Sequence, residues 1–149
     1  MANAALPRVA LLVPAYNCQE DLNASIRDLP LEEPLHILIV DDGSTPPLAA
    51  PPCNPVHTVE IVRNEANLKI HGALRRGVKL LSARGFAYVA RLDAGDFALP
   101  ARFSLQRTFL DEHPQVAVVG SAYELVDEKD RLICAFRLPL DDAQIRRFR

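Results

Sequence analysis

The 149-residue sequence lacks an excess of charge of either sign, a pattern of cysteines and a hydrophobic run of membrane-spanning length. Its 17 basic and 19 acidic residues leave a formal charge of -2, and no basic run suited to a phosphate backbone occurs. The composition therefore gives no electrostatic case for nucleic acid as a partner. The most basic segment, Arg75 and Arg76 with Lys79, has helical spacing and is interpreted as a solvated helix face.

The three cysteines, Cys18, Cys53 and Cys134, are far apart and match neither a zinc site nor a redox pair, so we expect reduced thiols. The four histidines also lack metal-ligand spacing and are expected to be structural or at the surface: His36, His57, His71 and His113. Residues 1–8 lack the apolar segment of a signal peptide. We expect a cytoplasmic protein, with peripheral contact at the inner membrane face left open.

Apolar runs alternate with amphipathic segments along the chain. We expect strands over residues 9–13, 35–40, 57–62, 86–92 and 116–120, and helices over residues 19–29, 69–84 and 100–112. The polar–apolar alternation of residues 57–62 fits a strand near the sheet's edge. A hairpin is expected over residues 124–136, and the proline-rich residues 46–55 are expected to form a surface loop. This order predicts an α/β fold with a doubly wound, mostly parallel sheet flanked by helices.

Two of the expected helices carry candidate core residues. In the helix over residues 69–84 these are Ile70, Ala73, Leu74, Val78 and Leu81. In the helix over residues 100–112 they are Phe103, Leu105, Phe109 and Leu110. At the end of the chain, Asp141 and Asp142 look like the N-cap of a helix that stops at Arg149 after about two turns. We interpret residues 141–149 as a helix cut short, and residues 1–149 as the front half of a longer protein or as a truncated relative of one.

Acidic pairs follow two of the expected strands. Asp93 and Asp96 come after residues 86–92, and Asp41 and Asp42 come after residues 35–40. In open α/β sheets ligands bind at the carboxyl edge of the strands. Acids gathered there can hold a hard divalent cation and, through it, a phosphate-bearing ligand.

Other side chains are expected at the same rim. Pro14, Ala15 and Tyr16 close the first strand. Lys69, together with Arg63 or Arg91, can reach the same edge. An aromatic ring, acids that accept from base or ribose donors, and basic groups for a diphosphate together describe a nucleoside-diphosphate site.

Each of these features also has a structural interpretation. An acid after a strand is often a turn former or a helix N-cap. Tyr16 alone could serve packing, and Lys69 alone could be a solvated lysine at a helix start. The functional interpretation depends on finding side chains that suit a nucleotide at all three strand ends at once.

An ordered set of motifs resembles the N-terminal half of a family 2 glycosyltransferase with the GT-A fold. The resemblance covers nearly the whole chain from Arg8 onward, and it rests on residues 13–17, 39–44, 63–64 with Asn67, 90–96, 100–106 and 118–121. It implies a nucleotide-sugar donor, usually a UDP-sugar, and transfer with inversion, in the assembly of cell-surface polysaccharide or lipopolysaccharide.

Carried over by position, Pro14, Ala15 and Tyr16 would line the base, Asp42 with Asp41 would accept from the base or ribose, and Asp93 would lie beside the ribose and a metal. The full set of nucleotide-sugar contacts expected is Pro14, Ala15, Tyr16, Asp41, Asp42, Asn67, Lys69, Arg91 and Asp93.

The sequence departs from the family pattern at three places. The second acid of the family's Asp-X-Asp motif falls at Gly95, so Mg²⁺ or Mn²⁺ is expected at Asp93 with Asp96 as the substitute ligand. Lys69 stands where relatives often have glycine. The expected catalytic base and the elements that bind the acceptor, a glycan or a lipid-linked sugar, lie beyond Arg149, so no catalytic residue is expected within the chain.

Two other functions stay open. A truncated, non-catalytic nucleotide-binding or interaction domain would expose an apolar patch that favours homodimers. A phosphoacceptor signalling domain also holds Mg²⁺ with acids at strand ends, but it needs an acidic pair after the first strand, where this sequence has Pro14, Ala15 and Tyr16.

Overall fold

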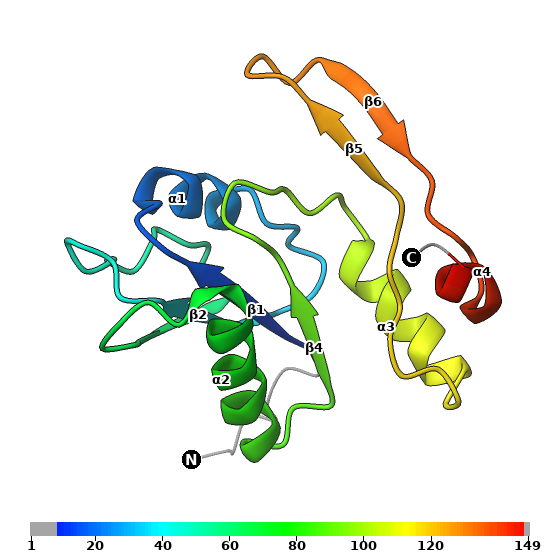
Figure 1. Cartoon of the computed structure of the whole chain (residues 1–149), viewed down its shortest axis with the longest axis horizontal. Coiled ribbons are helices and arrows are strands. Elements are labelled where there is room, and N and C mark those ends of the chain that lie inside the picture. Colours follow the sequence, from blue (N-terminus) through cyan, green and yellow to red (C-terminus); the bar gives the residue numbers. More distant parts are fainter. Residues whose placement is uncertain (1–8, 148–149) are drawn as a thin grey trace. The chain divides into compact units, whose positions relative to one another are not determined.

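The computed structural model describes residues 9–147, and the chain divides into two compact units, Met1–Phe109 and Leu110–Arg149. Figure 1 shows both units along the chain. The first unit contains a four-stranded sheet and the second a two-stranded sheet.

The sheet of the first unit consists of parallel strands. Its members are β1 (Val9–Ala15), β2 (His36–Asp41), β3 (Thr58–Arg63) and β4 (Tyr88–Arg91). Their order is β3-β2-β1-β4, and every pairing is parallel. The predicted α/β fold with a parallel sheet is therefore confirmed, and β3 lies at the edge as expected.

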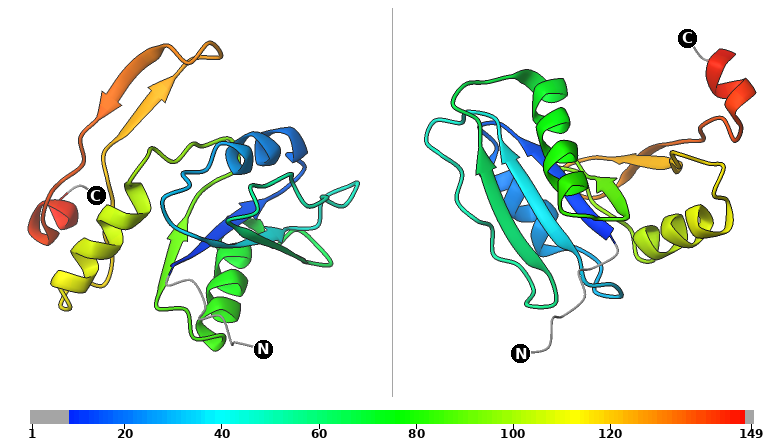
Figure 2. Two further views of the ribbon diagram at one scale, coloured as in Figure 1. Left: turned by 180° about the vertical axis from the view of Figure 1, so that it is seen from behind. Right: turned by 90° about the horizontal axis from the view of Figure 1, so that it is seen from below.

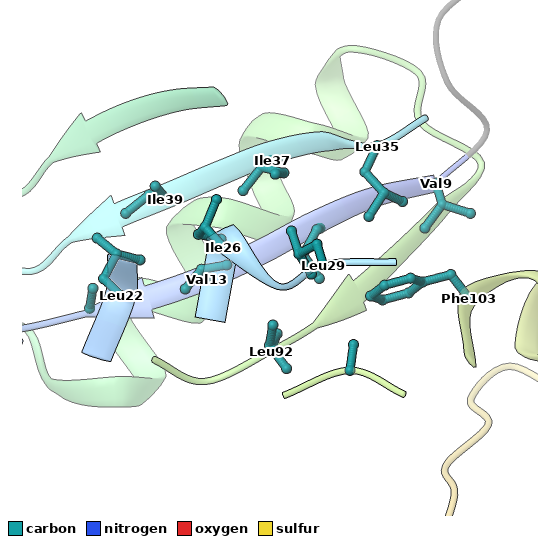
Figure 3. Packing of buried hydrophobic residues seen from close by; sticks show 13 residues of the cluster. Val9, Val13, Leu22, Ile26, Leu29, Leu35, Ile37, Ile39, Leu92 and Phe103 are labelled. Carbon is teal, nitrogen blue, oxygen red and sulfur yellow. The ribbon is translucent and has the colours of Figure 1, made fainter. Parts of the chain in front are cut away.

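A different helix covers each face of this sheet. Successive side chains of a strand point to opposite faces. On one face, Leu22 and Ile26 of α1 (Gln19–Arg27) pack with side chains of β1 and β2 (Figure 3). On the other face, Leu81 of α2 (Lys69–Ala83) packs with the alternate set. Figure 2 shows the two helices on opposite sides. The central strands are continuous apolar runs because both of their faces are buried.

The predicted buried stripe of α2 is wrong in part. Ala73 and Leu81 are buried as predicted, but Ile70 and Val78 are exposed. The third buried position is Gly77, where an added Cβ would lie 2.2 Å from a side-chain carbon of β1. The helix therefore packs on the sheet along its small residues, and Val78, about 100° further round, faces solvent.

The third helix, α3 (Arg102–Glu112), begins two residues later than predicted, because Ala101 has a positive φ of 63°. Phe103 is buried in the core of the first unit (Figure 3), as expected. Leu105 and Phe109, expected to be buried, are exposed. Leu105 lies about 200° round the helix from Phe103, so one helix face cannot bury both.

The second unit contains a hairpin and a short helix. β5 (Tyr123–Val126) pairs antiparallel with β6 (Leu132–Phe136), which confirms the predicted hairpin. The helix α4 (Asp142–Arg147) is capped by Asp141, whose Oδ1 accepts from the Gln144 N–H at 2.8 Å. The predicted N-cap is therefore confirmed, while residues 148 and 149 lie outside the described part of the chain.

The predicted strand over residues 116–120 is wrong. These residues form no strand, and Val118 is exposed. An apolar run becomes a strand only when another strand pairs with it, and no described strand takes that place here.

The proline-rich residues 46–55 contain neither helix nor strand. Their start is tied to the sheet, because the Leu48 N–H donates to Asp41 Oδ2 at 3.2 Å. The three cysteines are free thiols. None of the helices described between residues 9 and 147 has the length and apolar character needed to cross a membrane.

Candidate functional site

Three parallel strands end at one edge of the sheet, and the predicted site residues follow those ends. Just beyond β2, the Asp42 N–H donates to the Ala15 carbonyl at 2.9 Å. On the other side of β1, the Leu92 N–H donates to the Leu12 carbonyl at 3.2 Å, directly before Asp93. Asp42 and Asp93 therefore flank the carboxyl end of β1 on its two sides.

A pocket of about 280 Å³ lies at this edge. Its lining combines the end of β1, the end of β2 and the start of α2, and comprises Pro14, Ala15, Tyr16, Asp42, Asn67, Lys69, Ile70 and Ala73. Six of the nine predicted nucleotide-sugar contacts are in this set. Tyr16 is 48% exposed, so its ring is available to a ligand and is not part of the core.

Asp42 is almost completely buried, yet it is among the residues that line this pocket. The residue is 3% exposed. Its Oδ1 accepts from Asn64 Nδ2 at 2.5 Å and from the Leu68 N–H at 3.0 Å. No hydrogen bond from residues 9–147 reaches its Oδ2, which is left for a donor on a ligand.

The loop after β2 packs closely on the loop before α2. Gly43 has a φ of 82°, and an added Cβ would lie 2.9 Å from backbone atoms of Ala66 and Asn67. A side chain at this position would push the two loops apart. The close approach brings Asp42 and Asn67 to one pocket.

Asp41 holds the loop and is not among the described residues that line the pocket. Its carboxylate accepts from the Ser44 N–H at 2.9 Å, from the Leu48 N–H, and from the Arg63 guanidinium. Burial raises the pKa of this carboxyl, but the hydrogen bonds from Ser44, Leu48 and Arg63 outweigh it and hold the pKa below its usual range. The structure thus gives Asp41 a supporting position, and its direct contact with a nucleotide stays a prediction.

Lys69 begins α2 with a φ of 63°, and its N–H donates to Asn67 Oδ1 at 2.9 Å. This left-handed conformation costs a non-glycine residue about 1–2 kcal/mol, which is the physical reason that glycine suits this position. A residue kept in such a conformation beside a pocket suggests a role for its side chain.

The turn after β4 carries the second acidic pair. Arg91 donates to both oxygens of Asp93, from Nε at 2.8 Å and from Nη2 at 2.6 Å. Gly95 has a φ of 97°, and its N–H donates to Ser25 Oγ on α1 at 2.9 Å. Arg91 and Asp93 are both about half exposed and lie outside the set that lines the pocket.

Burial and the neighbouring Asp93 charge raise the pKa of Asp96. Burial also lowers the pKa of Arg102, whose Nη2 donates to the Arg91 carbonyl at 2.8 Å. Arg102 Nε is buried and makes no hydrogen bond to the described residues. The turn therefore places two carboxylates and two guanidinium groups close together.

A divalent cation at this turn would need ligands besides the protein carboxylates. Asp93 and Asp96 offer carboxylate oxygens, and Mg²⁺ is commonly held by one or two carboxylates together with substrate phosphates. Among residues 9–147 no group of three or more His, Cys, Asp or Glu could hold a metal, so a substrate diphosphate or water would supply the remaining ligands. An ion there would also compete with Arg91 for Asp93.

Three residues at or behind the pocket lay outside the predicted site. Ile70 and Ala73 are expected in the helix core, although Ile70 lies in the first turn of α2 and Ala73 one position beyond it, near the strand ends. Asn64 directly follows β3 and is 2% exposed, with its amide on Asp42. A buried amide of this kind is recognised only when its partners are known.

Two histidines have structural positions. His57 is buried, and its Nδ1 accepts from the Leu35 N–H at 3.2 Å. His36 stacks on Phe86 with the ring centroids 5.0 Å apart. Burial lowers the pKa of both imidazoles, which favours their neutral forms.

Residues 10–133 match the sequence profile of the family described as Glycosyl transferase family 2. Since this match spans most of the chain, the chain belongs to that family. Members of the family often use divalent metals.

Curated relatives share this assignment. The chain is 29% identical over 130 residues to an uncharacterized glycosyltransferase of Haemophilus influenzae, covering 83% of this chain and 39% of that protein. It is 27% identical over 128 residues to the putative glycosyltransferase EpsE of Bacillus subtilis, covering 82% and 45%. It is 38% identical over 90 residues to the amylovoran biosynthesis glycosyltransferase AmsE of Erwinia amylovora, covering 59% and 32%. The chain thus spans less than half the length of these relatives.

Among solved structures, TarS residues 1–349 of S. aureus resemble the chain with a TM-score of 0.49 at 19% identity, covering 71% of this chain and 33% of that one. The same protein in complex with UDP-GlcNAc gives a TM-score of 0.46 at 17% identity, covering 79% and 40%.

Proposed function

We propose that this chain is the donor-binding part of a glycosyltransferase and that its pocket holds a nucleoside-diphosphate sugar, most simply a UDP-sugar. The observation that carries the proposal is the pocket itself, in which Tyr16, Asp42 and Lys69 come together from three different segments at the carboxyl edge of the sheet. Ligands of open α/β sheets bind at this edge. Membership of Glycosyl transferase family 2 supports the same class of ligand.

Each predicted side chain has a role that its chemistry allows. Tyr16 offers an exposed ring on which a base can stack, beside Pro14 and Ala15. Asp42 offers Oδ2 as an acceptor for a donor on the base or ribose. Lys69 supplies a positive charge at the pocket for the diphosphate.

The turn after β4 extends this site. Asp93 would contact the ribose, and Arg91 would contact the diphosphate once it releases Asp93. Asp93 and Asp96 would hold Mg²⁺ or Mn²⁺ together with the diphosphate. Neutralisation of the charge on a departing diphosphate is the chemistry that a bound ion would supply there.

The remaining parts of the proposal come from the relatives. The amylovoran biosynthesis in the name of AmsE leads us to propose a step in polysaccharide biosynthesis. Membership of Glycosyl transferase family 2 leads us to propose inverting transfer, with a glycan or lipid-linked sugar as acceptor. We place this step in the cytoplasm, at the inner face of the membrane. No residue of this chain is assigned as the base that deprotonates the acceptor.

Calorimetric titration with UDP tests the proposal, in Mn²⁺ and again in EDTA. Asp42→Asn keeps Oδ1 for its two donors and replaces the free Oδ2 by an NH₂ group. We expect it to weaken UDP binding on the order of tenfold or more. Asp93→Ala is expected to weaken binding by a similar factor. Asp28→Asn, an exposed acid at the end of α1, is the matched control and should leave the affinity unchanged.

The comparison of UDP binding in Mn²⁺ with UDP binding in EDTA tests Asp96 separately. UDP should bind more tightly in Mn²⁺ than in EDTA, and Asp96→Asn should remove that difference. A wild-type chain that binds no UDP under either condition would show that the assignment of the donor site is wrong.

A second function, an interaction domain that forms homodimers, is favoured by the hairpin of the second unit. Leu125, Leu132 and Ile133 are all exposed there. Exposed apolar patches of soluble proteins often mark sites of association. Light scattering over a range of concentrations separates the two cases: a monomer at every concentration would count against the dimer.

A further inference from the structure

Arg76 of α2 reaches back to the end of β3. Its Nη1 donates to the Arg63 carbonyl at 2.7 Å and also to Asn64 Oδ1. Its neighbour Arg75 is exposed and takes part in no such contact among the described residues. The solvated helix face predicted for this basic segment therefore holds for Arg75 and is wrong for Arg76.

The bond from Arg76 fixes which way the Asn64 amide points. Since Asn64 Oδ1 accepts from the guanidinium, Nδ2 is the group that donates to Asp42 Oδ1, at 2.5 Å. The opposite orientation would set an NH₂ group against a guanidinium and a carbonyl oxygen against a carboxylate, so both contacts would be repulsive. Asn64 is also held through its backbone, because its N–H donates to the Asp41 carbonyl at 2.8 Å.

The Asn64 amide in turn fixes the carboxylate. Asp42 Oδ1 accepts from two donors, Asn64 Nδ2 and the Leu68 N–H, at the two ends of the connection between β3 and α2. Two donors on one oxygen hold the plane of the carboxylate, and they leave Oδ2 as the oxygen available to the pocket. Linked hydrogen bonds strengthen one another, so the positive charge of Arg76 at the half-buried end of the chain supports the buried bond from Asn64 to Asp42.

We infer that Arg76 and Asn64 are positioning residues for nucleotide recognition: the chain Arg76–Asn64–Asp42 aims Asp42 Oδ2 at the donor group of the nucleoside. This inference rests on the proposed function, since it concerns the same pocket. Arg76 itself is not among the residues that line the pocket, so it acts through Asn64 and not by touching the ligand.

A double-mutant cycle measured with UDP in Mn²⁺ tests the inference. Arg76→Gln should weaken UDP binding about five- to tenfold, because Asp42 loses its fixed orientation. Arg75→Gln, one position along the same helix, is the matched control and should change the affinity less than about twofold. In an Asp42→Asn background the free acceptor is already gone, so Arg76→Gln should have almost no further effect.

The cycle separates positioning from a general structural role. Thermal unfolding of each variant, followed by titration well below its midpoint, shows whether the chain is folded when it binds. Equal weakening by Arg76→Gln in both backgrounds, or none in the wild-type background, would overturn the inference while leaving the donor site intact. A folded wild-type chain that binds no UDP would overturn the proposed function and this inference together.

Discussion

The two units contain apolar strands of similar composition, but they bury them to different extents. In the first unit all seven residues of β1 and five of the six in β2 are buried. In the second, all four residues of β5 are exposed, as are four of the five in β6. The central strands lie between α1 and α2, whereas no residue of α4 is buried. An apolar strand is buried only if another layer covers it.

A matched pair of side-chain truncations should show the largest difference in the free energy of unfolding between the two units. Leu38→Ala in β2 removes a side chain that is 0% exposed, and it should lower the free energy of unfolding by about 2–5 kcal/mol. Leu132→Ala in β6 truncates a residue that is 59% exposed and should cost no more than about 0.5 kcal/mol. Urea denaturation measures both. A comparable cost at Leu132 would mean that the hairpin is covered in solution, and the contrast would fail.

Glycine substitutions extend the comparison to the loops. Gly43→Ala meets the backbone of Ala66 and Asn67 at 2.9 Å and strains a positive φ, so it should destabilise the first unit by about 1–3 kcal/mol. It should also weaken UDP binding, because it moves Asn67 away from Asp42. Gly120→Ala has nothing within 4 Å of its new Cβ and should be close to neutral. Denaturation followed by UDP titration checks both variants, and an unchanged UDP affinity in Gly43→Ala would show that the loop contact does not shape the pocket.

The smallest effect concerns pH. The pKa of Asp41 is lowered in the folded chain, so the folded state binds fewer protons than the unfolded state. Its contribution to stability is complete above the unfolded pKa of about 3.9 and is lost as the pH falls through the folded value. Asp41→Asn should therefore reduce the loss of stability below about pH 5.

Asp127 of the second unit is the control for that experiment. Its hydrogen bonds with Arg131 lower its pKa in the same direction, but its side chain is 27% exposed, against 1% for Asp41, and Arg131 is largely exposed. Solvent screens such a pair, so Asp127→Asn should leave the loss of stability at acid pH almost unchanged. Urea unfolding midpoints of the wild-type chain and both variants, measured between pH 3 and pH 7, test this difference. Similar curves for the two variants would contradict the difference in burial.

Much of the site could be predicted because it depends on strand ends. Asp42 and Asp93 follow apolar runs, and parallel strands present their carboxyl ends at one edge, so the sequence places both acids near the end of β1. The pocket is lined by Asp42 together with Tyr16, Asn67 and Lys69, as expected. Whether each of these residues binds a nucleotide stays a prediction.

The errors have a common physical origin. Residues 116–120 have the composition of a strand, but strand formation requires a partner that composition does not specify. Val78 and Leu105 have helical spacing that suits a core. In α2, however, the close approach at Gly77 decides which face packs on the sheet. In α3 the burial of Phe103 decides it. Arg75 and Arg76 cannot be distinguished by pattern, since only the packing of α2 on the sheet shows which one meets Asn64.

By itself the sequence determined the order of strands and helices, apart from the strand expected over residues 116–120, and the acids at the strand ends, because periodicity and turn chemistry are local properties of the chain. The tertiary structure alone decided that Asp41 supports the loop while Asp42 lines the pocket. These outcomes depend on hydrogen bonds between residues far apart in sequence, such as those from Arg63 to Asp41 and from Asn64 to Asp42. No local pattern encodes such partners, since they meet only when the sheet and its two helices have packed together.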